Sequence, residues 1–168
     1  MKPNLLIVDD ETVIREVLSE RLALAGYQCD TAANGIEAMN RLKNGDRYSL
    51  VLSDIEMPGQ NGMALLREIK QAYPDIDVVM VTGVVAIDTA IKSIRMGASD
   101  YITKPFNLDE VIITVERTLE KRRLIHENRE YQVSLEQMVQ ERTQEVIRKG
   151  QEVEGLYKEL KTAFEQIR

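Results

Sequence analysis

Short apolar runs alternate with longer amphipathic segments along the first hundred residues of the chain. The apolar runs predict five strands, at Leu5–Val8, Tyr27–Thr31, Leu50–Leu52, Ile76–Val81 and Tyr101–Ile102. The first, third and fourth runs are almost wholly apolar, which is typical of strands buried on both faces of a sheet. The second run is more polar, so we expect it at a sheet edge.

Between these strands, apolar residues recur at helical spacing, and each such segment ends near a glycine or a proline. The apolar positions of the four predicted helices are Val13, Val17, Leu18, Leu22 and Ala25; Ile36, Met39 and Leu42; Met63, Leu66 and Ile69; and Ile87, Ala90, Ile91 and Ile94. Asn34 is expected to cap the second helix. Alternation of strands and helices predicts right-handed crossovers and an α/β fold in which helices cover both faces of a parallel sheet.

The pattern changes after Pro105, because residues 107–168 contain no proline and are rich in helix formers. A first apolar stripe is expected to pack on the sheet; it comprises Leu108, Val111, Ile112, Val115 and Leu119. Beyond it, a seven-residue repeat predicts a marginal parallel coiled coil, because its first positions are mostly apolar whereas half of its companion positions are not. The first positions are Ile125, Gln132, Val139, Val146, Val153, Leu160 and Ile167, and the companions are Asn128, Leu135, Arg142, Lys149, Leu156 and Ala163.

Composition and charge narrow the class of protein. A formal net charge of -6 disfavours binding to a phosphate backbone, so we expect no direct contact with nucleic acid. The single cysteine, Cys29, excludes an internal disulfide and fits a reducing compartment. The sequence suggests neither a secretory leader nor a membrane-spanning run, so we expect a cytoplasmic protein without a membrane partner.

Five polar side chains lie at the carboxyl ends of predicted strands. They are Asp9 and Asp10 after the first strand, Asp54 after the third, Thr82 after the fourth and Lys104 after the fifth. The carboxyl ends of parallel strands meet at one edge of a sheet, so these side chains should converge. Separate helix caps or solvated acids are the alternative interpretation, and the combination of all five disfavours it.

Such a cluster suits phosphoryl transfer. Two carboxylates about 4 Å apart repel each other by about 4 kcal/mol at an effective dielectric of about 20, and a hard cation such as Mg²⁺ relieves that repulsion. A cation, an ammonium and a hydroxyl can stabilise the oxygens of a phosphoryl group in transfer. The central carboxylate, Asp54, would then be the nucleophile and form an acyl phosphate.

Four stretches of the sequence resemble the receiver domains of two-component response regulators. They are Leu6–Glu11, Ser53–Gly59 with Asn61–Gly62, Val81–Gly83 and Tyr101–Phe106, and the resemblance covers about residues 1–120. It implies a flavodoxin-like, doubly wound sheet of five strands in the order 2-1-3-4-5. It also implies that a partner histidine kinase donates its phosphoryl group to Asp54.

The resemblance implies a role for each residue of the cluster. Asp10, Asp54 and the main-chain carbonyl of Glu56 would be the Mg²⁺ ligands, with Asp9 acting directly or through a water. Lys104 would pair with the phosphoryl group.

The resemblance also implies a switch. On phosphorylation, Thr82 would move toward the phosphoryl oxygens and the Tyr101 ring would turn inward behind it. Lys104–Pro105 would be a cis peptide. Val84–Val85 departs from the family, in which small or polar residues are more usual there, and would change access to the pocket.

We therefore expect a receiver domain over residues 1–120 and a helical extension over 121–168, continuous with the last helix of the domain. The extension, together with the last helices of the domain, would mediate homodimerisation and pass the signal to an output domain or partner, and the chain would be a fragment of a larger regulator. Its chemistry would be limited to its own phosphorylation and dephosphorylation. A coiled-coil adaptor without phosphate chemistry is the alternative, and an independent phosphatase is disfavoured because no second domain caps the pocket.

Two smaller features have ordinary explanations. The single histidine, His126, lacks the flanking residues of a phosphodonor motif and is interpreted as a solvated helix residue. The basic cluster Lys121–Arg123 is interpreted as a charged helical junction and not as a site for nucleic acid or lipid.

Overall fold

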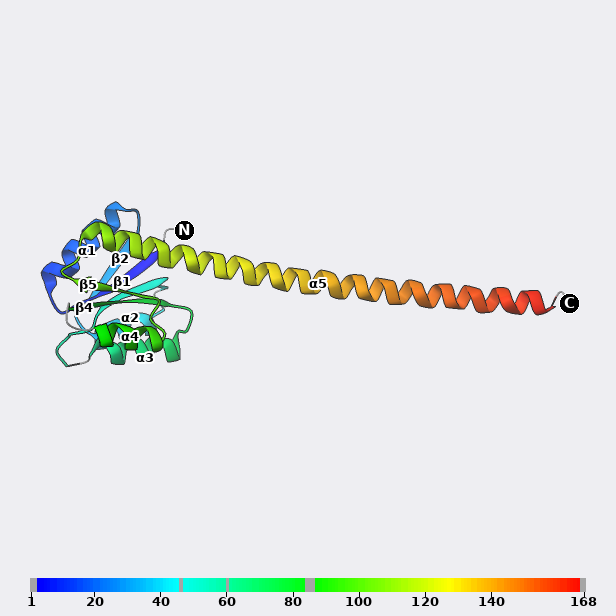
Figure 1. The fold of residues 1–168 in the computed structure, drawn as a ribbon, viewed down its shortest axis with the longest axis horizontal. Helices are drawn as coiled ribbons and strands as arrows, with labels where there is room; N and C mark the ends of the chain where they lie inside the picture. The colour runs from blue at the N-terminus through cyan, green and yellow to red at the C-terminus, as the bar shows by residue number, and fades with distance from the viewer. Residues whose placement is uncertain (1–2, 46, 60, 84–86, 167–168) are drawn as a thin grey trace. The chain divides into compact units, whose positions relative to one another are not determined.

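The computed structural model describes residues 3–45, 47–59, 61–83 and 87–166, and its first part is a parallel sheet with helices on both faces (Figure 1). The strands are β1 (Asn4–Val8), β2 (Gln28–Ala32), β3 (Leu50–Asp54), β4 (Asp77–Gly83) and β5 (Asp100–Lys104). The helices are α1 (Thr12–Leu24), α2 (Gly35–Lys43), α3 (Gly62–Ala72), α4 (Ile87–Arg95) and α5 (Leu108–Gln166). The strand order β2-β1-β3-β4-β5 confirms the flavodoxin-like topology and the edge position of the polar second strand.

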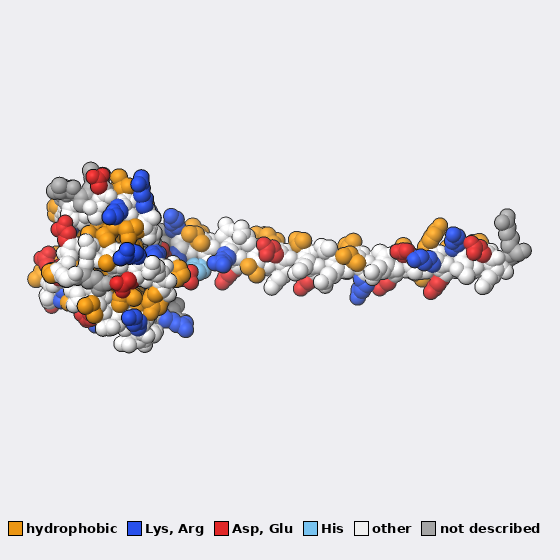
Figure 2. Space-filling model, turned by 90° about the horizontal axis from the view of Figure 1, so that it is seen from below, with side chains coloured by type: hydrophobic (Ala, Val, Ile, Leu, Met, Phe, Trp, Pro, Cys, Tyr) orange, Lys and Arg blue, Asp and Glu red, His pale blue; other side chains and the backbone are white. Residues whose placement is uncertain are grey.

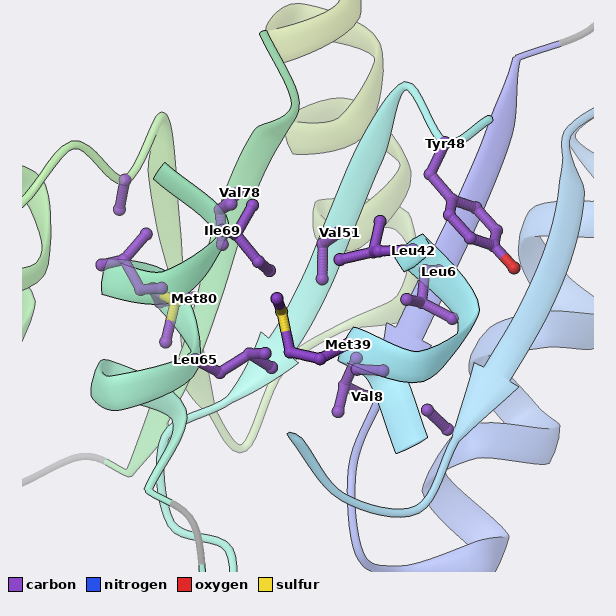
Figure 3. Close-up of a cluster of buried hydrophobic side chains, with 14 of the residues drawn as sticks. Leu6, Val8, Met39, Leu42, Tyr48, Val51, Leu65, Ile69, Val78 and Met80 are labelled. Atoms are coloured by element: carbon purple, nitrogen blue, oxygen red, sulfur yellow. The ribbon is translucent and has the colours of Figure 1, made fainter. Parts of the chain in front are cut away.

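Two apolar clusters fill the two faces of the sheet, because successive residues of a strand point to opposite sides. On one face, Leu6 and Val8 of β1 lie in the same cluster as side chains of α2 and α3, including Met39 and Leu65 (Figure 3). On the other face, Leu5 and Ile7 belong to the cluster that contains buried residues of α1 and α5: Leu18, Leu22, Val111 and Val115. Burial on both faces explains why β1 is almost continuously apolar, and the predicted packing of the first stripe of α5 is confirmed.

The apolar faces predicted for α1, α2 and α4 are wrong in part. In α2, Met39 and Leu42 are buried as predicted, but Ile36 is 66% exposed. Val13 and Val17 of α1 are exposed, because the buried face follows Leu18 and Leu22 with the partly buried Ile14 one turn before them. In α4, Ala90 and Ser93 are buried, whereas Ile91 and Ile94 are 48% and 42% exposed. Small residues let α4 lie close to the sheet, so its larger aliphatic residues point outward.

The predicted helix ends agree with the structure where local chemistry sets them. The Asn34 side chain accepts a hydrogen bond from the Glu37 N–H at 2.9 Å and caps α2, as predicted. Gly97 follows α4 with a φ of 100°, a left-handed conformation that glycine adopts without steric cost.

The chain divides into two compact units, Met1–Arg122 and Arg123–Arg168. Arg122 is the last residue of the first unit and donates hydrogen bonds to the carbonyl oxygens of Ser49 and Asp75. One residue of the basic cluster is therefore used in contacts within the first unit. His126 is exposed, as predicted.

The second unit is helical throughout its described residues, 123–166, where none is buried and Glu145 alone is half-buried. Apolar and charged side chains are interspersed along it (Figure 2). None of the helices in the described part of the chain combines the length and the apolar character needed to cross a membrane.

Candidate functional site

Three carboxylates meet at the carboxyl edge of the sheet. Asp54 is the last residue of β3, and Asp9 and Asp10 directly follow β1. Carboxylate oxygens of the three residues lie within 4.8 Å of one another. Asp9 and Asp54 are buried, whereas Asp10 is exposed. The convergence predicted for these side chains is therefore found.

Lys104, the last residue of β5, neutralises part of this negative charge. Its Nζ donates hydrogen bonds to Oδ2 of Asp54 at 3.0 Å and to Oδ2 of Asp9 at 3.1 Å. Burial lowers the pKa of Lys104, but the hydrogen bonds and charges of Asp54 and Asp9 outweigh it and raise that pKa above its ordinary value. Lys104 thus contacts two of the three carboxylates, and within the described residues the cluster retains negative charge.

Burial has the opposite consequence for Asp54. It raises the pKa of the Asp54 carboxyl, although the hydrogen bond and charge of Lys104 and the Glu56 N–H act to lower it. Ionisation of Asp54 therefore costs more free energy in the folded protein than in water. A positive charge added beside the carboxylate would offset that cost.

Main-chain donors fix two of the three carboxylates. The Glu11 N–H donates to Asp9 Oδ1 at 2.8 Å, and the Glu56 N–H donates to Asp54 Oδ1 at 3.3 Å. Within the described residues, no hydrogen bond or ion pair holds the carboxylate of Asp10.

Gly62 lets α3 begin directly against Asp54. A Cβ at this position would lie 2.0 Å from the Asp54 carbonyl oxygen, a distance that the backbone cannot accommodate. The Gly62 N–H donates to the Ile55 carbonyl at 3.1 Å, and the Asn61 side chain caps the helix by accepting from the Met63 N–H at 2.7 Å. The sequence singled out the Asn61–Gly62 pair but not the contact that requires glycine.

The remaining predicted residues lie as follows. Thr82 is buried in β4, one position beyond the residue paired with Asp54, and its hydroxyl makes a long hydrogen bond of 3.5 Å to the Gly83 carbonyl. The Tyr101 side chain is 44% exposed and so does not point inward in this state. The cis peptide at Lys104–Pro105 is confirmed. Val84–Val85 lies outside the described residues.

The donor set fits a hard cation. All three side chains offer carboxylate oxygens, which are the ligands that Mg²⁺ prefers. Oxygens bound to one Mg²⁺ ion lie about 3 to 4 Å apart, so small side-chain rotations would bring oxygens now within 4.8 Å onto one ion.

Comparisons with known proteins agree with this geometry. The family model described as the response regulator receiver domain matches residues 5–116. The chain is 39% identical over 127 residues to the C4-dicarboxylate transport transcriptional regulatory protein DctD of Rhizobium meliloti, covering 76% of this chain and 27% of that protein. It is 42% identical over 113 residues to the DNA-binding transcriptional regulator NtrC of Escherichia coli, covering 67% of this chain and 24% of that protein. The chain spans about a quarter of the length of these relatives.

Solved structures show the same similarity in three dimensions. The receiver domain of NtrX from Brucella abortus matches with a TM-score of 0.66 at 40% identity, covering 69% of this chain and 98% of that chain. The chemotaxis response regulator CheY4 of Vibrio cholerae matches with a TM-score of 0.66 at 28% identity, covering 70% and 99%. The similarity therefore extends over nearly the whole of both solved chains.

Proposed function

The chain belongs to the response regulator receiver domain family, and on that premise we propose that Asp54 accepts a phosphoryl group from a phosphohistidine of a sensor histidine kinase. The observation that supports this most strongly is the environment of the Asp54 carboxylate. It ends a central strand, it is 5% exposed, and it lies 3.0 Å from the Lys104 ammonium beside two further carboxylates.

In the proposed reaction, a carboxylate oxygen of Asp54 attacks the phosphorus as the phosphorus–nitrogen bond to the donor imidazole breaks. The imidazole leaves with the bonding electrons and takes up a proton, and Asp54 becomes an acyl phosphate. Lys104 already contacts Asp54 Oδ2, so its ammonium can stabilise the charge on the phosphoryl oxygens. The Glu56 N–H holds the other oxygen, Oδ1, in place.

The metal site follows from the same cluster. Asp10, Asp54 and the main-chain carbonyl of Glu56 would hold Mg²⁺, with Asp9 acting directly or through a water. The ion supplies positive charge beside the incoming phosphoryl oxygens when it is bound. Lys104 pairs with Asp9 and Asp54, so the three carboxylates keep a net negative charge that a cation would neutralise. This charge supports the assignment.

The switch would begin at Thr82. Among the described residues its hydroxyl makes only a long hydrogen bond, to the Gly83 carbonyl, so exchanging that bond for one to a phosphoryl oxygen costs little. Movement of Thr82 would open space behind it, and the exposed ring of Tyr101 would turn inward.

We propose that the phosphorylation state passes through α5 to an output domain or a partner protein in the cytoplasm. In the second unit, apolar residues at the first heptad positions are exposed, including Val139, Val146 and Val153. A second copy of the chain in a parallel coiled coil would bury them, with the last helices of the receiver adding to the contact. NtrC is a DNA-binding transcriptional regulator and DctD is a transcriptional regulatory protein, so the output domain or partner of this chain would act in transcription.

Labelling with acetyl phosphate tests the phosphoacceptor. The unaltered chain and the control Asp75→Asn, which changes an exposed aspartate, should incorporate phosphate when Mg²⁺ is present. Asp54→Asn should incorporate none. Undiminished labelling of Asp54→Asn would refute the assignment, and failure of the unaltered chain to incorporate phosphate would favour the adaptor.

A further inference from the structure

We propose that Arg15 is a positioning residue for the metal site, because it fixes the loop between β1 and α1 so that the Asp10 carboxylate faces the cation. This inference rests on the proposed Mg²⁺ site. It concerns a residue that contacts neither the cation nor the phosphoryl group.

The Arg15 guanidinium joins two residues of that loop to the first residue of α1. Nη1 donates hydrogen bonds to the carbonyl oxygens of Asp9 at 2.7 Å and of Asp10 at 3.0 Å, and Nη2 donates to Thr12 Oγ1 at 3.0 Å. Arg15 lies one turn into α1 and is half-buried. One side chain thus ties the main chain of both acidic residues to the start of the helix.

Asp10 depends on this tie more than its neighbours do. The Asp9 and Asp54 carboxylates each accept a hydrogen bond from Lys104 and another from a main-chain N–H. The Asp10 carboxylate accepts none from the described residues, so its position is set by its own main chain.

The start of α1 lacks a side-chain cap. Its N-cap residue, Glu11, makes no side-chain capping hydrogen bond. In most helices a capping side chain fixes the first turn and the loop before it. Here the contacts of Arg15 with Asp10 and Thr12 take that place.

The choice of acceptors has a chemical consequence. Arg15 binds the carbonyl oxygens of Asp9 and Asp10 and leaves the Asp10 carboxylate free for a cation. A guanidinium paired with that carboxylate would compete with the metal.

The direction in which Mg²⁺ affinity changes when Arg15 is replaced distinguishes a positioning role from a simple effect of its charge. A positive charge near a cation site weakens binding, so loss of the Arg15 charge alone would tighten Mg²⁺ binding. Loss of positioning would weaken it, as removal of residues that orient metal ligands does.

Calorimetric titration of the full chain with Mg²⁺, without a phosphodonor, measures that sign. We expect Arg15→Ala to bind Mg²⁺ ~10-fold more weakly than the unaltered chain. Arg15→Lys, which keeps the charge and one donor group, should lose less. The control Arg21→Ala removes an equal charge from the same helix, together with its exposed ion pair to Asp109, and should bind as the unaltered chain does.

Acetyl-phosphate labelling at increasing Mg²⁺ adds a second readout. Arg15→Ala should need more Mg²⁺ and then reach the rate of the unaltered chain, because Arg15 touches no reacting atom. Equal or tighter Mg²⁺ binding by Arg15→Ala, or equal weakening by Arg21→Ala, would overturn the inference while the proposed function stands. If circular dichroism finds Arg15→Ala unfolded, Mg²⁺ binding by Arg15→Lys is the test. Binding by Arg15→Lys equal to that of the unaltered chain would then overturn the positioning role. No Mg²⁺ binding by the unaltered chain would overturn the proposed site and this inference together.

Discussion

The two units of the chain use the same kinds of residue in different ways. In residues 3–122 most ion pairs join segments far apart in the sequence, such as Arg21–Asp109 and Lys104–Asp9. In residues 123–166 the ion pairs join residues three or four positions apart, such as Arg142–Glu145 and Arg148–Glu152. Local pairs on an exposed helix surface contribute little to stability, because water and salt screen them. The first unit therefore owes its structure to its own tertiary contacts. The ion pairs found in residues 123–166 are local, which is why we propose that a second copy of the chain covers this unit.

Truncation of one leucine in each unit should give the largest difference. Leu66 is fully buried against the sheet, and Leu66→Ala should lower the free energy of unfolding by ~3 kcal/mol. Leu156 is 65% exposed, so Leu156→Ala should change that free energy by less than ~0.5 kcal/mol in dilute, monomeric protein. Urea unfolding measures both. Similar losses in the two variants would mean that the second unit buries its apolar residues within one chain.

A charge on the apolar stripe of the second unit tests whether a second copy covers it. Val139 occupies a first heptad position and is 64% exposed, and Val139→Asp should weaken dimerisation ~100-fold, or about 2.7 kcal/mol. Gln144→Asp adds the same charge away from the seam and should have little effect. Sedimentation equilibrium measures the dissociation constants, and an equal response of the two variants would argue against this pairing.

Glycine-to-alanine changes should have opposite signs in the two units. Gly62→Ala forces a Cβ against the Asp54 carbonyl and should lower the free energy of unfolding by ~2 kcal/mol. It should also reduce phosphorylation of Asp54. Gly150 lies in α5 with nothing near its Cβ position, so Gly150→Ala should stabilise the helix by ~1 kcal/mol. Thermal melts followed by circular dichroism measure both changes. A stabilising Gly62→Ala would contradict the close contact at the site.

The smallest predicted effect concerns the cost of holding Asp54 ionised. Because its folded pKa is raised, the wild-type chain loses stability as the pH rises from the ordinary value of about 4 through that raised pKa. Asp54→Asn should therefore raise the melting temperature by ~3 °C at neutral pH without metal, and the gain should vanish below about pH 4. Asp75→Asn controls for the loss of a charge, and a lower melting temperature of Asp54→Asn at neutral pH would contradict the prediction.

The sequence predicted the order of the strands and the convergence of the three carboxylates with Lys104, because both depend on where strands end. Asp54 and Lys104 are the last residues of β3 and β5, and the pairing of parallel strands brings such ends to the same edge of the sheet. The faces of α1 and α4 were harder to predict. Val13 and Val17 have the right spacing, but the rotation of a helix on a sheet is set by its packing partners and not by its own pattern.

Two contacts at the site had almost no sequence signal. Arg15 has the appearance of an ordinary surface residue of a helix, because its acceptors are main-chain carbonyls that carry no sequence identity. The constraint at Gly62 arises from the approach of α3 to Asp54, which depends on the tertiary fold. Both are visible only once the loops at the carboxyl edge are placed.

The most direct test of phosphorylation at Asp54 is to locate the phosphoryl group on the unaltered full chain. After incubation with acetyl phosphate, intact-mass measurement should find one phosphoryl group per chain with Mg²⁺ and none with a chelator. Cleavage by trypsin and peptide mapping should then place it on the peptide of residues 48–67, at Asp54. A phosphoryl group on any other peptide, or none in the presence of Mg²⁺, would contradict the account.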